Sequence, residues 1–439
     1  MSSKLTSPQF NNYPPTSFMN RYSDVILFAI KERKECINYL HMPYCNRRCG
    51  YCILSSVVRD TEKLDKEIDF IMKEIDMYSQ HTTDREIVAA LWGGGTPSLL
   101  SADQVHRVYG HAREKMAFSP NAEITVEMKP DTVTKENLDA FINCGVNRLS
   151  FGVQTLNEME LKYCNRENTP KIIFDAIDLA TKSGLTNMNF DLMIGLPSQT
   201  LETFRETCET IFGSLQPNCC SLYILIVHPK TSFSTLLQNK PELFPHNEEI
   251  IRMYYTFFEV AEKHGYVATS TLNVARKPSL KSKYQYYNWL GYERIAIGPE
   301  AIGYIGQTQY INYSWRNEEY GEFLKKNKFP IRIGYTLTTE QIIRRWIILG
   351  LQNLSIDINV INAAYGINVL NDYREVWGKL KLNNFIKIEG SQINLTHLGK
   401  RHLYAIQTMF YEEHVDVAQK GVAGVIIKES DHQVDTVVA

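Results

Sequence analysis

Short apolar segments alternate with amphipathic ones along most of the chain. Six are bounded by glycine, proline or polar turns, as strands are: Cys36–Met42, Ile87–Trp92, Glu123–Met128, Arg148–Val153, Met188–Ile194 and Cys219–Val227. Five segments between them show helical periodicity: Glu62–Ser79, Ala102–Met116, Lys135–Asn143, Pro170–Ser183 and Leu201–Phe212. Ser101 with Gln104 forms a capping box, and Gly145, Gly184 and Gly265 follow helical runs as C-terminal caps.

Strands separated by helices pair in parallel through right-handed crossovers. The pattern therefore predicts an α/β fold, a partial (β/α)6 barrel of the TIM type, over residues 36–325. In such barrels the chemistry lies at the C-terminal ends of the strands. Residues 1–35 are polar and turn-rich, and we expect an irregular extension there with a short helix around Asp24 to Glu32.

The segment from Thr338 to His414 has a different character. Thr338 and Gln341 open a helix, two further helical stretches follow, and two short strands, Phe385–Ile388 and Gln392–Leu395, flank a turn. This order predicts a small C-terminal domain with a helical, winged-helix-like shape over residues 335–414. Residues 415–439 carry little pattern and are expected to form a tail.

Composition narrows the possible partners. The chain has 439 residues, of which 44% are hydrophobic and 22% charged, with a net charge of −2, so no basic field points to nucleic acid or an anionic membrane. The N-terminus lacks the pattern of a secretory signal, and no apolar run approaches the roughly 20 residues of a membrane span. We expect a soluble, cytoplasmic protein that binds neither nucleic acid nor membrane.

Three of the nine cysteines stand in a spacing that suits metal chemistry. Cys45, Cys49 and Cys52 are separated by three and then two residues, just after the first predicted strand. A loop there can hold a 4Fe–4S cluster by three thiolates and leave one iron open for S-adenosylmethionine (SAM), whose reductive cleavage gives a 5′-deoxyadenosyl radical. The alternatives are buried thiols, as expected for the other six cysteines, or a zinc site, for which His41 is the only near fourth ligand.

Two features at the next strand ends point to a cofactor. Gly93, Gly94, Gly95 and Thr96 follow the second strand, and such glycines let the backbone approach a ligand closely and present amide groups to it. Glu127 ends the third strand, where a carboxylate can accept hydrogen bonds from a ribose or an ammonium group. The alternative for Glu127 is a salt bridge to Lys129.

The following strand ends carry further polar residues. Gln154 ends the fourth strand, and Arg166 follows it as a natural partner for the carboxylate of a ligand. The alternative for Arg166 is an ordinary salt bridge to Glu160 or Glu167. Asp191 lies in an otherwise apolar strand, where a carboxylate is costly unless it is paired. These positions make all three residues candidates for a binding site.

The chemistry of the substrate is less well marked. Residues 284–316 contain nine tyrosines and tryptophans, which either line a pocket for a flat substrate or simply pack. No residue is marked by the sequence as the acid or base for a substrate proton. Tyr223 and His228, near the end of the sixth strand, are considered for that role on position alone.

Taken together, these motifs resemble the HemN-like branch of radical SAM proteins, from about Glu35 to Tyr411. That branch contains oxygen-independent coproporphyrinogen dehydrogenases, heme chaperones, anaerobic heme-opening enzymes, and class C methyltransferases and cyclopropanases. The resemblance implies a 4Fe–4S cluster, two SAM molecules, an electron donor of the flavodoxin or ferredoxin type, and a C-terminal domain that need not bind DNA. It places around one SAM Tyr39, Gly94, Glu127 and Ile302, and around the other Tyr51, Gly95, Thr96, Gln154, Arg166 and Asp191.

Two departures from the family pattern bear on the substrate. The dehydrogenase motif has a further cysteine where this chain has Leu54, and the heme-chaperone signature has a histidine that Tyr284–Trp289 lacks. The resemblance therefore favours transfer of a methyl or methylene group from a second SAM to an unactivated carbon of a small or peptide-borne natural product. The alternatives are tetrapyrrole chemistry, by coproporphyrinogen oxidation or heme opening, and a heme chaperone that does no catalysis.

Overall fold

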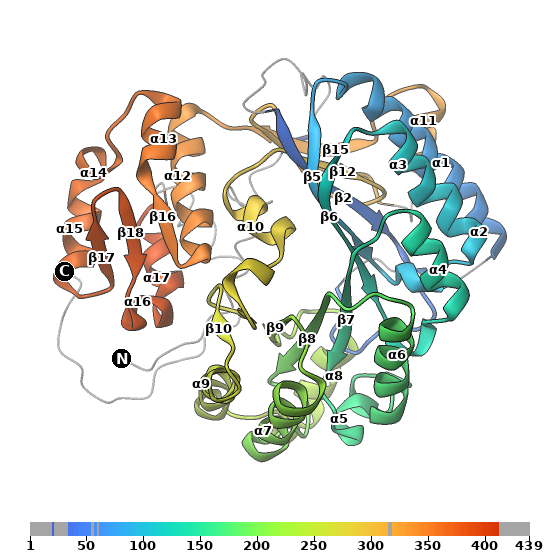
Figure 1. Ribbon diagram of the computed structural model, residues 1–439, viewed down its shortest axis with the longest axis horizontal. Helices are drawn as coiled ribbons and strands as arrows, with labels where there is room; N and C mark the ends of the chain where they lie inside the picture. Colours follow the sequence, from blue (N-terminus) through green and yellow to red (C-terminus); the bar gives the residue numbers. More distant parts are fainter. Residues whose placement is uncertain (1–19, 22–33, 54–56, 59–60, 315–317, 412–439) are drawn as a thin grey trace.

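The computed structural model describes residues 20–21, 34–53, 57–58, 61–314 and 318–411 (Figure 1). Outside these ranges lie the helix expected around Asp24 to Glu32 and the expected C-terminal tail. The single residues Leu54 and Trp315 lie outside them as well. Within them, none of the helices combines the length and the apolar character needed to cross a membrane.

Six parallel strands form the centre of the large sheet and neighbour one another in chain order, which confirms the predicted alternation. Met188–Ile194 has the predicted bounds, whereas the last of the six ends at Ile224, three residues before the predicted end at Val227. The six strands are β2 (Glu35–Met42), β5 (Glu86–Gly94), β6 (Phe118–Met128), β7 (Arg148–Gln154), β8 (Met188–Ile194) and β9 (Cys219–Ile224).

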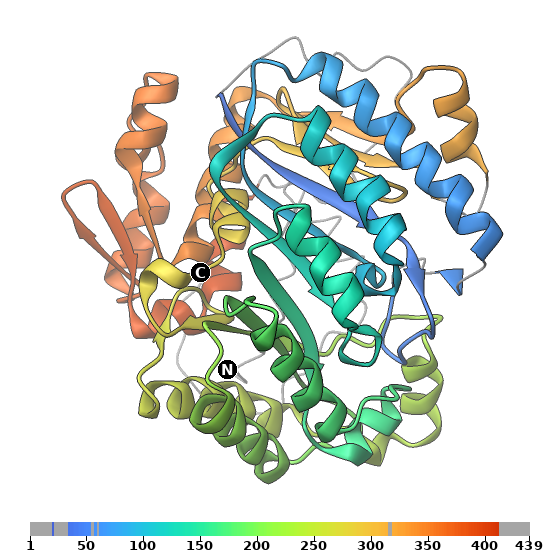
Figure 2. The same ribbon diagram turned by 45° about the vertical axis from the view of Figure 1, so that its right-hand side comes forward.

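Helices that follow these strands cover the outer face of the sheet (Figure 2). They are α1 (Thr61–His81), the continuous run of α2 (Ala102–Val105), a π-helical segment and α3 (His111–Lys115), then α4 (Lys135–Asn143), α6 (Pro170–Lys182) and α7 (Leu201–Glu209). Ser101 and Gln104 make the predicted capping box. The large core lies between these helices and the sheet, where Trp92 stacks on Tyr109 with ring centroids 4.4 Å apart. The sequence pattern thus identified the helical layer as well as the strands.

The sheet is larger than predicted, and it stays open. β12 (Arg294–Ile297) adds a seventh parallel strand beside β2, and the antiparallel strands β13 (Ile302–Ile305), β14 (Thr308–Asn312), β15 (Ile331–Thr336) and β1 (Asn20–Arg21) extend that edge. β11 (Asn273–Ala275) and β10 (Val267–Ala268) extend the opposite edge. Since β1 and β10 end the sheet without pairing with each other, the barrel is partial, as expected.

Further helices belong to the part of the chain that forms the partial barrel. They are α5 (Glu158–Tyr163), α8 (Ser232–Asn239), α9 (Asn247–Lys263), α10 (Lys283–Trp289) and α11 (Glu319–Lys325).

A smaller unit stands beside the barrel (Figure 1). Its predicted parts are α12 (Thr339–Gly350) and the hairpin of β17 (Ile386–Glu389) and β18 (Gln392–Leu395), to which β16 (Ser355–Asp357) adds an unpredicted third strand. Where two helical stretches were predicted before the hairpin, the structure has α13 (Ile358–Tyr365), α14 (Val369–Asp372) and α15 (Arg374–Leu382). After the hairpin come α16 (His397–Arg401) and α17 (Leu403–Thr408). This unit has a hydrophobic cluster of its own, so we propose residues 335–414 as a second domain.

Candidate functional site

One cavity of about 430 Å³ opens at the C-terminal ends of the parallel strands. It brings together residues that are up to 183 positions apart in the sequence, from Cys45 to His228. The sequence-predicted residues that line it are Cys45, Cys49, Tyr51, Cys52, Gly94, Gly95, Thr96, Glu127, Gln154, Arg166 and Asp191. The strand-end rule of α/β barrels therefore located this set correctly.

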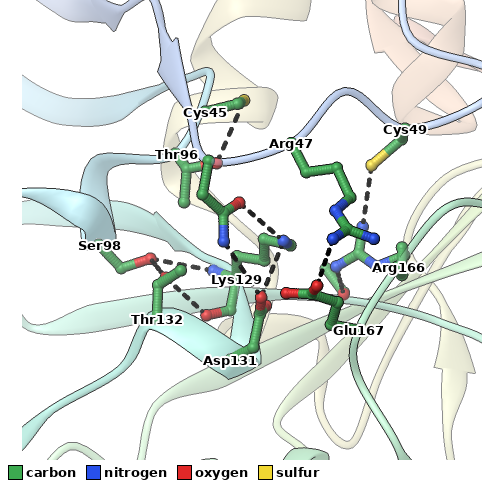
Figure 3. Close-up of polar contacts among 12 residues, drawn as sticks. Cys45, Arg47, Cys49, Thr96, Ser98, Lys129, Asp131, Thr132, Arg166 and Glu167 are labelled. Atoms are coloured by element: carbon green, nitrogen blue, oxygen red, sulfur yellow. Dashed lines mark hydrogen bonds and ion pairs between the residues drawn. The ribbon is translucent and has the colours of Figure 1, made fainter. Parts of the chain in front are cut away.

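The cysteine loop, residues 45–52, contacts neighbouring side chains at two of its three cysteines (Figure 3). Cys45 Sγ lies 3.3 Å from Thr96 Oγ1, and Arg166 Nη1 lies 3.8 Å from Cys49 Sγ. The six remaining cysteines are buried, as predicted, and none of the nine forms a disulfide. In the described part of the chain, no three His, Cys, Asp or Glu side chains are close enough to hold one metal ion, so the three thiols frame a wider space.

The glycine turn is required for close packing. A Cβ on Gly93 would overlap the carboxylate of Glu127, a Cβ on Gly95 would overlap the backbone of Tyr44, and Gly94 has a φ of +107°. The amide of Gly94 donates to Glu127 Oε2 at 3.0 Å, and that of Gly95 to the Met42 carbonyl at 2.6 Å. These two amides already have protein partners, so the turn fixes Glu127 and the cysteine loop instead of offering the amides to a ligand.

Two carboxylates face the cavity. Burial, followed by the charge of Asp191, raises the pKa of Glu127 to about 7, and the expected alternative of a salt bridge fails because Lys129 pairs with Asp131 at 2.8 Å. Burial raises the pKa of Asp191 to about 6, although it accepts hydrogen bonds from Ser150 and Asn189. Each carboxyl group is thus poised to ionise when a cationic ligand enters.

Arg166 supplies a buried cation next to the cysteine loop. It donates to the Gly152 carbonyl at 2.6 Å and to Tyr51 Oη at 3.2 Å. Burial lowers the pKa of Arg166, but the neighbouring Tyr51 and Cys49 raise this pKa above its ordinary value. Arg166 does not form the alternative salt bridges to Glu160 or Glu167. Glu160 accepts hydrogen bonds from Thr155 and Thr203, and Glu167 pairs with Arg47.

Three of the sequence-predicted residues do not line the cavity. Tyr39 lies behind the glycine turn, where its hydroxyl is 2.8 Å from His41 Nδ1, and Gly93 lies beneath Glu127. Ile302 begins β13 and is half-buried outside the cavity lining. No residue of 284–314 lines the cavity either: Tyr304 and Tyr310 are buried, which supports packing as the role of this aromatic segment.

Other cavity residues carried weaker sequence signals. Tyr223 and His228 both line the cavity, and His228 Nε2 is buried without a hydrogen-bond partner among the described residues. Ser150 lies two positions before Gly152 on β7, so strand alternation places it on the cavity face. Lys129 also lines the cavity; its position two residues after Glu127 was the available signal.

Comparison with known proteins accords with this geometry. Residues 39–211 match the model of the radical SAM superfamily. The heme chaperone HemW of Bacillus subtilis is 30% identical over 364 residues, which cover 82% of this chain and 95% of that protein. This chain belongs to the HemN/HemW family of radical SAM proteins.

Other members of the HemN/HemW family support the assignment over most of the chain. The oxygen-independent coproporphyrinogen III oxidase of Salmonella typhimurium is 27% identical, with 90% of each chain covered. The solved structure of HemN from Escherichia coli superposes with a TM-score of 0.81 at 24% identity, over 92% of this chain and 96% of that one. The fold is therefore shared along the barrel and the smaller unit.

A radical SAM protein uses a 4Fe–4S cluster and SAM, and the cavity residues fit both groups. Three cysteines line the cavity, and the buried Arg166, whose Nε has no partner among the described residues, can meet a carboxylate. Glu127 and Asp191 offer anionic oxygens to a sulfonium, an ammonium or a ribose. When bound, the reduced cluster supplies the electron that cleaves SAM to methionine and a 5′-deoxyadenosyl radical.

Proposed function

We propose that this chain is a radical SAM enzyme that acts on a tetrapyrrole. The observation that carries the radical chemistry is the single cavity in which three thiols, two carboxylates and a buried arginine meet. The substrate class is supported by the relatives, since one is an oxidase of coproporphyrinogen III and another a chaperone of heme, and both compounds are tetrapyrroles.

The roles of the residues follow from their positions. We assign the cluster to Cys45, Cys49 and Cys52, because all three line the same cavity. Arg166 holds a carboxylate, and Glu127 holds a ribose or an ammonium group, because each is fixed by protein contacts before any ligand binds. Gln154 and Asp191 lie on the strands beyond Glu127, so they suit a second SAM or the substrate.

A second candidate is transfer of a one-carbon unit from a second SAM to a natural product. It is favoured by the presence of two separate cavity carboxylates and by Leu54, which replaces the extra cysteine of the dehydrogenase motif. It ranks second because the relatives named above are an oxidase and a chaperone, and neither is a one-carbon transferase.

Product analysis separates the candidates. The cluster is reconstituted anaerobically, SAM and dithionite are added with or without coproporphyrinogen III or heme, and 5′-deoxyadenosine and S-adenosylhomocysteine are measured by mass spectrometry. The triple variant Cys45→Ala, Cys49→Ala, Cys52→Ala is the control.

Each outcome of this experiment has a distinct meaning. We expect cysteine-dependent 5′-deoxyadenosine that increases when a tetrapyrrole is present. Accumulation of S-adenosylhomocysteine with it would favour one-carbon transfer. If neither product depends on the cysteines and heme binds at 1:1 with a shifted Soret band, the chain is a carrier and the enzymatic proposal fails.

A further inference from the structure

A buried ion pair of Lys129 and Asp131 lies beneath the cysteine loop (Figure 3), and its lysine lines the cavity. Lys129 Nζ is 2.8 Å from Asp131 Oδ2, and the two side chains are only 9% and 10% exposed. The same ammonium donates to Asn46 Oδ1 at 2.9 Å, and Asn46 directly follows Cys45 in the sequence. The pair therefore connects the end of β6 to the first part of the cysteine loop.

The backbone at Lys129 is held by hydrogen bonds that do not involve the side chains of Lys129 and Asp131. The amide of Lys129 donates to Ser98 Oγ at 3.1 Å, and Thr132 Oγ1 donates to the Lys129 carbonyl at 2.9 Å. Ser98 Oγ and Thr132 Oγ1 are 2.6 Å apart. Lys129 consequently has little freedom to move away from the loop when its surroundings change.

The network continues to the second cysteine of the loop. With the Asn168 amide oriented to satisfy both of its neighbours, it donates to Asp131 Oδ1 at 2.6 Å and accepts from Arg166 Nη2 at 3.2 Å. Arg166 in turn lies 3.8 Å from Cys49 Sγ. A chain of polar contacts therefore runs from the residue after Cys45 to Cys49.

Stability alone gives a poor account of such a pair. Removing two charges from water is costly, and apolar residues of similar volume often replace a buried ion pair with no loss of stability. Asp131 balances the charge of Lys129, so a variant without the ammonium would leave an unbalanced buried carboxylate beside the cysteine loop. Such a carboxylate disfavours the more negative state of any group near it, and an intact Lys129 prevents this effect. For a 4Fe–4S cluster that state is the reduced one, and charge and hydrogen bonding set cluster potentials.

We propose that Lys129 is a positioning residue for the cluster: it fixes the cysteine loop through Asn46 and makes the cluster easier to reduce. The role goes beyond the proposed function, because it requires only the cluster and holds for any substrate. In this role, Lys129 and its partner Asp131 favour transfer of an electron to the cluster.

The first test measures the midpoint potential of the reconstituted cluster by redox titration followed by electron paramagnetic resonance. We expect Lys129→Met to lower the potential and Lys129→Arg, which keeps the charge, to stay near wild type. The matched control is Lys135→Met, which breaks a surface pair of Lys135 and Asp139 outside the cavity. Equal potentials for Lys129→Met and Lys135→Met would overturn the electrostatic role.

The second test uses the protein without a cluster, so it does not depend on reconstitution. Alkylation of Cys45, Cys49 and Cys52 is followed by mass spectrometry, with the six buried cysteines as an internal check on folding. We expect Asn46→Ala and Lys129→Met to speed alkylation roughly tenfold, because a charge-assisted hydrogen bond that holds the loop is lost. Rates equal to those of Lys135→Met would overturn the positioning role, even if Lys129→Met proved too unstable for the first test.

Discussion

At the scale of single residues, Arg166 makes three contacts that a lysine cannot reproduce together. Its guanidinium reaches the Gly152 carbonyl, Tyr51 Oη and Cys49 Sγ from one planar group. We expect Arg166→Lys to lower the rate of 5′-deoxyadenosine formation roughly 10- to 100-fold, the effect of one or two lost charged hydrogen bonds. Mass spectrometry of the reconstituted enzyme measures this rate.

The control for that prediction is Arg205→Lys, which alters an exposed arginine paired with Glu259. It should leave the rate at the wild-type value. If Arg166→Lys matched this control at equal iron content, Arg166 would have no part in ligand binding.

Residue-level reasoning from the sequence singled out two carboxylates that the structure places at the cavity. Glu127 and Asp191 were predicted because a carboxylate at a strand end or in an apolar strand needs a reason to be there. The network of Lys129 and Asp131 was not, because a lysine beside an aspartate reads as an ordinary surface pair until its burial is known. Burial is a property of the folded chain, so one sequence cannot supply it.

At the scale of elements, β7 ends on a residue with unusual backbone geometry. Gln154 has a φ of +68°, a left-handed conformation that costs a non-glycine residue roughly 1–2 kcal/mol. We expect Gln154→Gly to be about 1 kcal/mol more stable than Gln154→Ala, because only glycine relieves the strain. Urea unfolding of the two variants measures the difference.

Both variants lose the same side chain, so both should bind SAM more weakly than wild type, and to a similar degree. A stability order with alanine above glycine would show that the end of β7 is unstrained. Wild-type SAM affinity in both would show that Gln154 does not bind SAM and would leave it only a role toward the substrate.

The hairpin of β13 and β14 depends on a small residue. A Cβ on Gly303 would overlap the ring of Tyr310, whose hydroxyl bonds Tyr78 at 2.9 Å. We expect Gly303→Ala to destabilise the protein by roughly 1–3 kcal/mol through overpacking, as measured by urea unfolding.

Gly378 of α15 provides the matched substitution, since nothing lies within 4 Å of its missing Cβ. There Gly378→Ala should stabilise the protein by up to about 1 kcal/mol, because alanine favours a helix. Equal effects at the two positions would contradict the overlap seen at Gly303.

The elements that the sequence predicted well are those with a long, regular pattern. Met188–Ile194 and Lys135–Asn143 have the predicted bounds, since turns and caps mark both ends. β12, β13 and β14 have four or five residues each, too few to establish a period, and they were missed. The equally short β17 and β18 were predicted because the turn at residues 389–391 separates them. α10 was missed because Lys283–Trp289 is rich in aromatic residues that favour strands.

At the scale of the whole molecule, a buried carboxylate connects helix α1 to segments at one edge of the open sheet. Glu74 of α1 accepts hydrogen bonds from the Gly298 amide at 2.8 Å, Asn312 Nδ2 at 2.7 Å and Tyr320 Oη at 2.5 Å. These partners lie more than 220 residues away in the sequence. Contacts at such separation depend on how the chain closes on itself, which explains why local pattern did not reveal them.

Glu74 should make the stability of the fold depend on pH. Burial raises its pKa from 4.5 to about 7, so between these values the folded state binds a proton that the unfolded state has released. The stabilising contribution of Glu74 is therefore complete below pH 4.5 and is lost as the pH rises to about 7. The expected loss is about 3 kcal/mol.

The difference in free energy of unfolding between wild type and Glu74→Gln isolates this effect from other titrating groups. Glutamine carries no titrating proton, so the advantage of wild type over Glu74→Gln should shrink between pH 4.5 and 7 and stay constant above. Urea unfolding at several pH values measures it, and Glu262→Gln on the exposed surface of α9 should run parallel to wild type. If Glu74→Gln also ran parallel to wild type, the carboxyl group would hold the same charge in the folded and unfolded chains, and the fastening of α1 to the far edge of the sheet would not depend on its protonation.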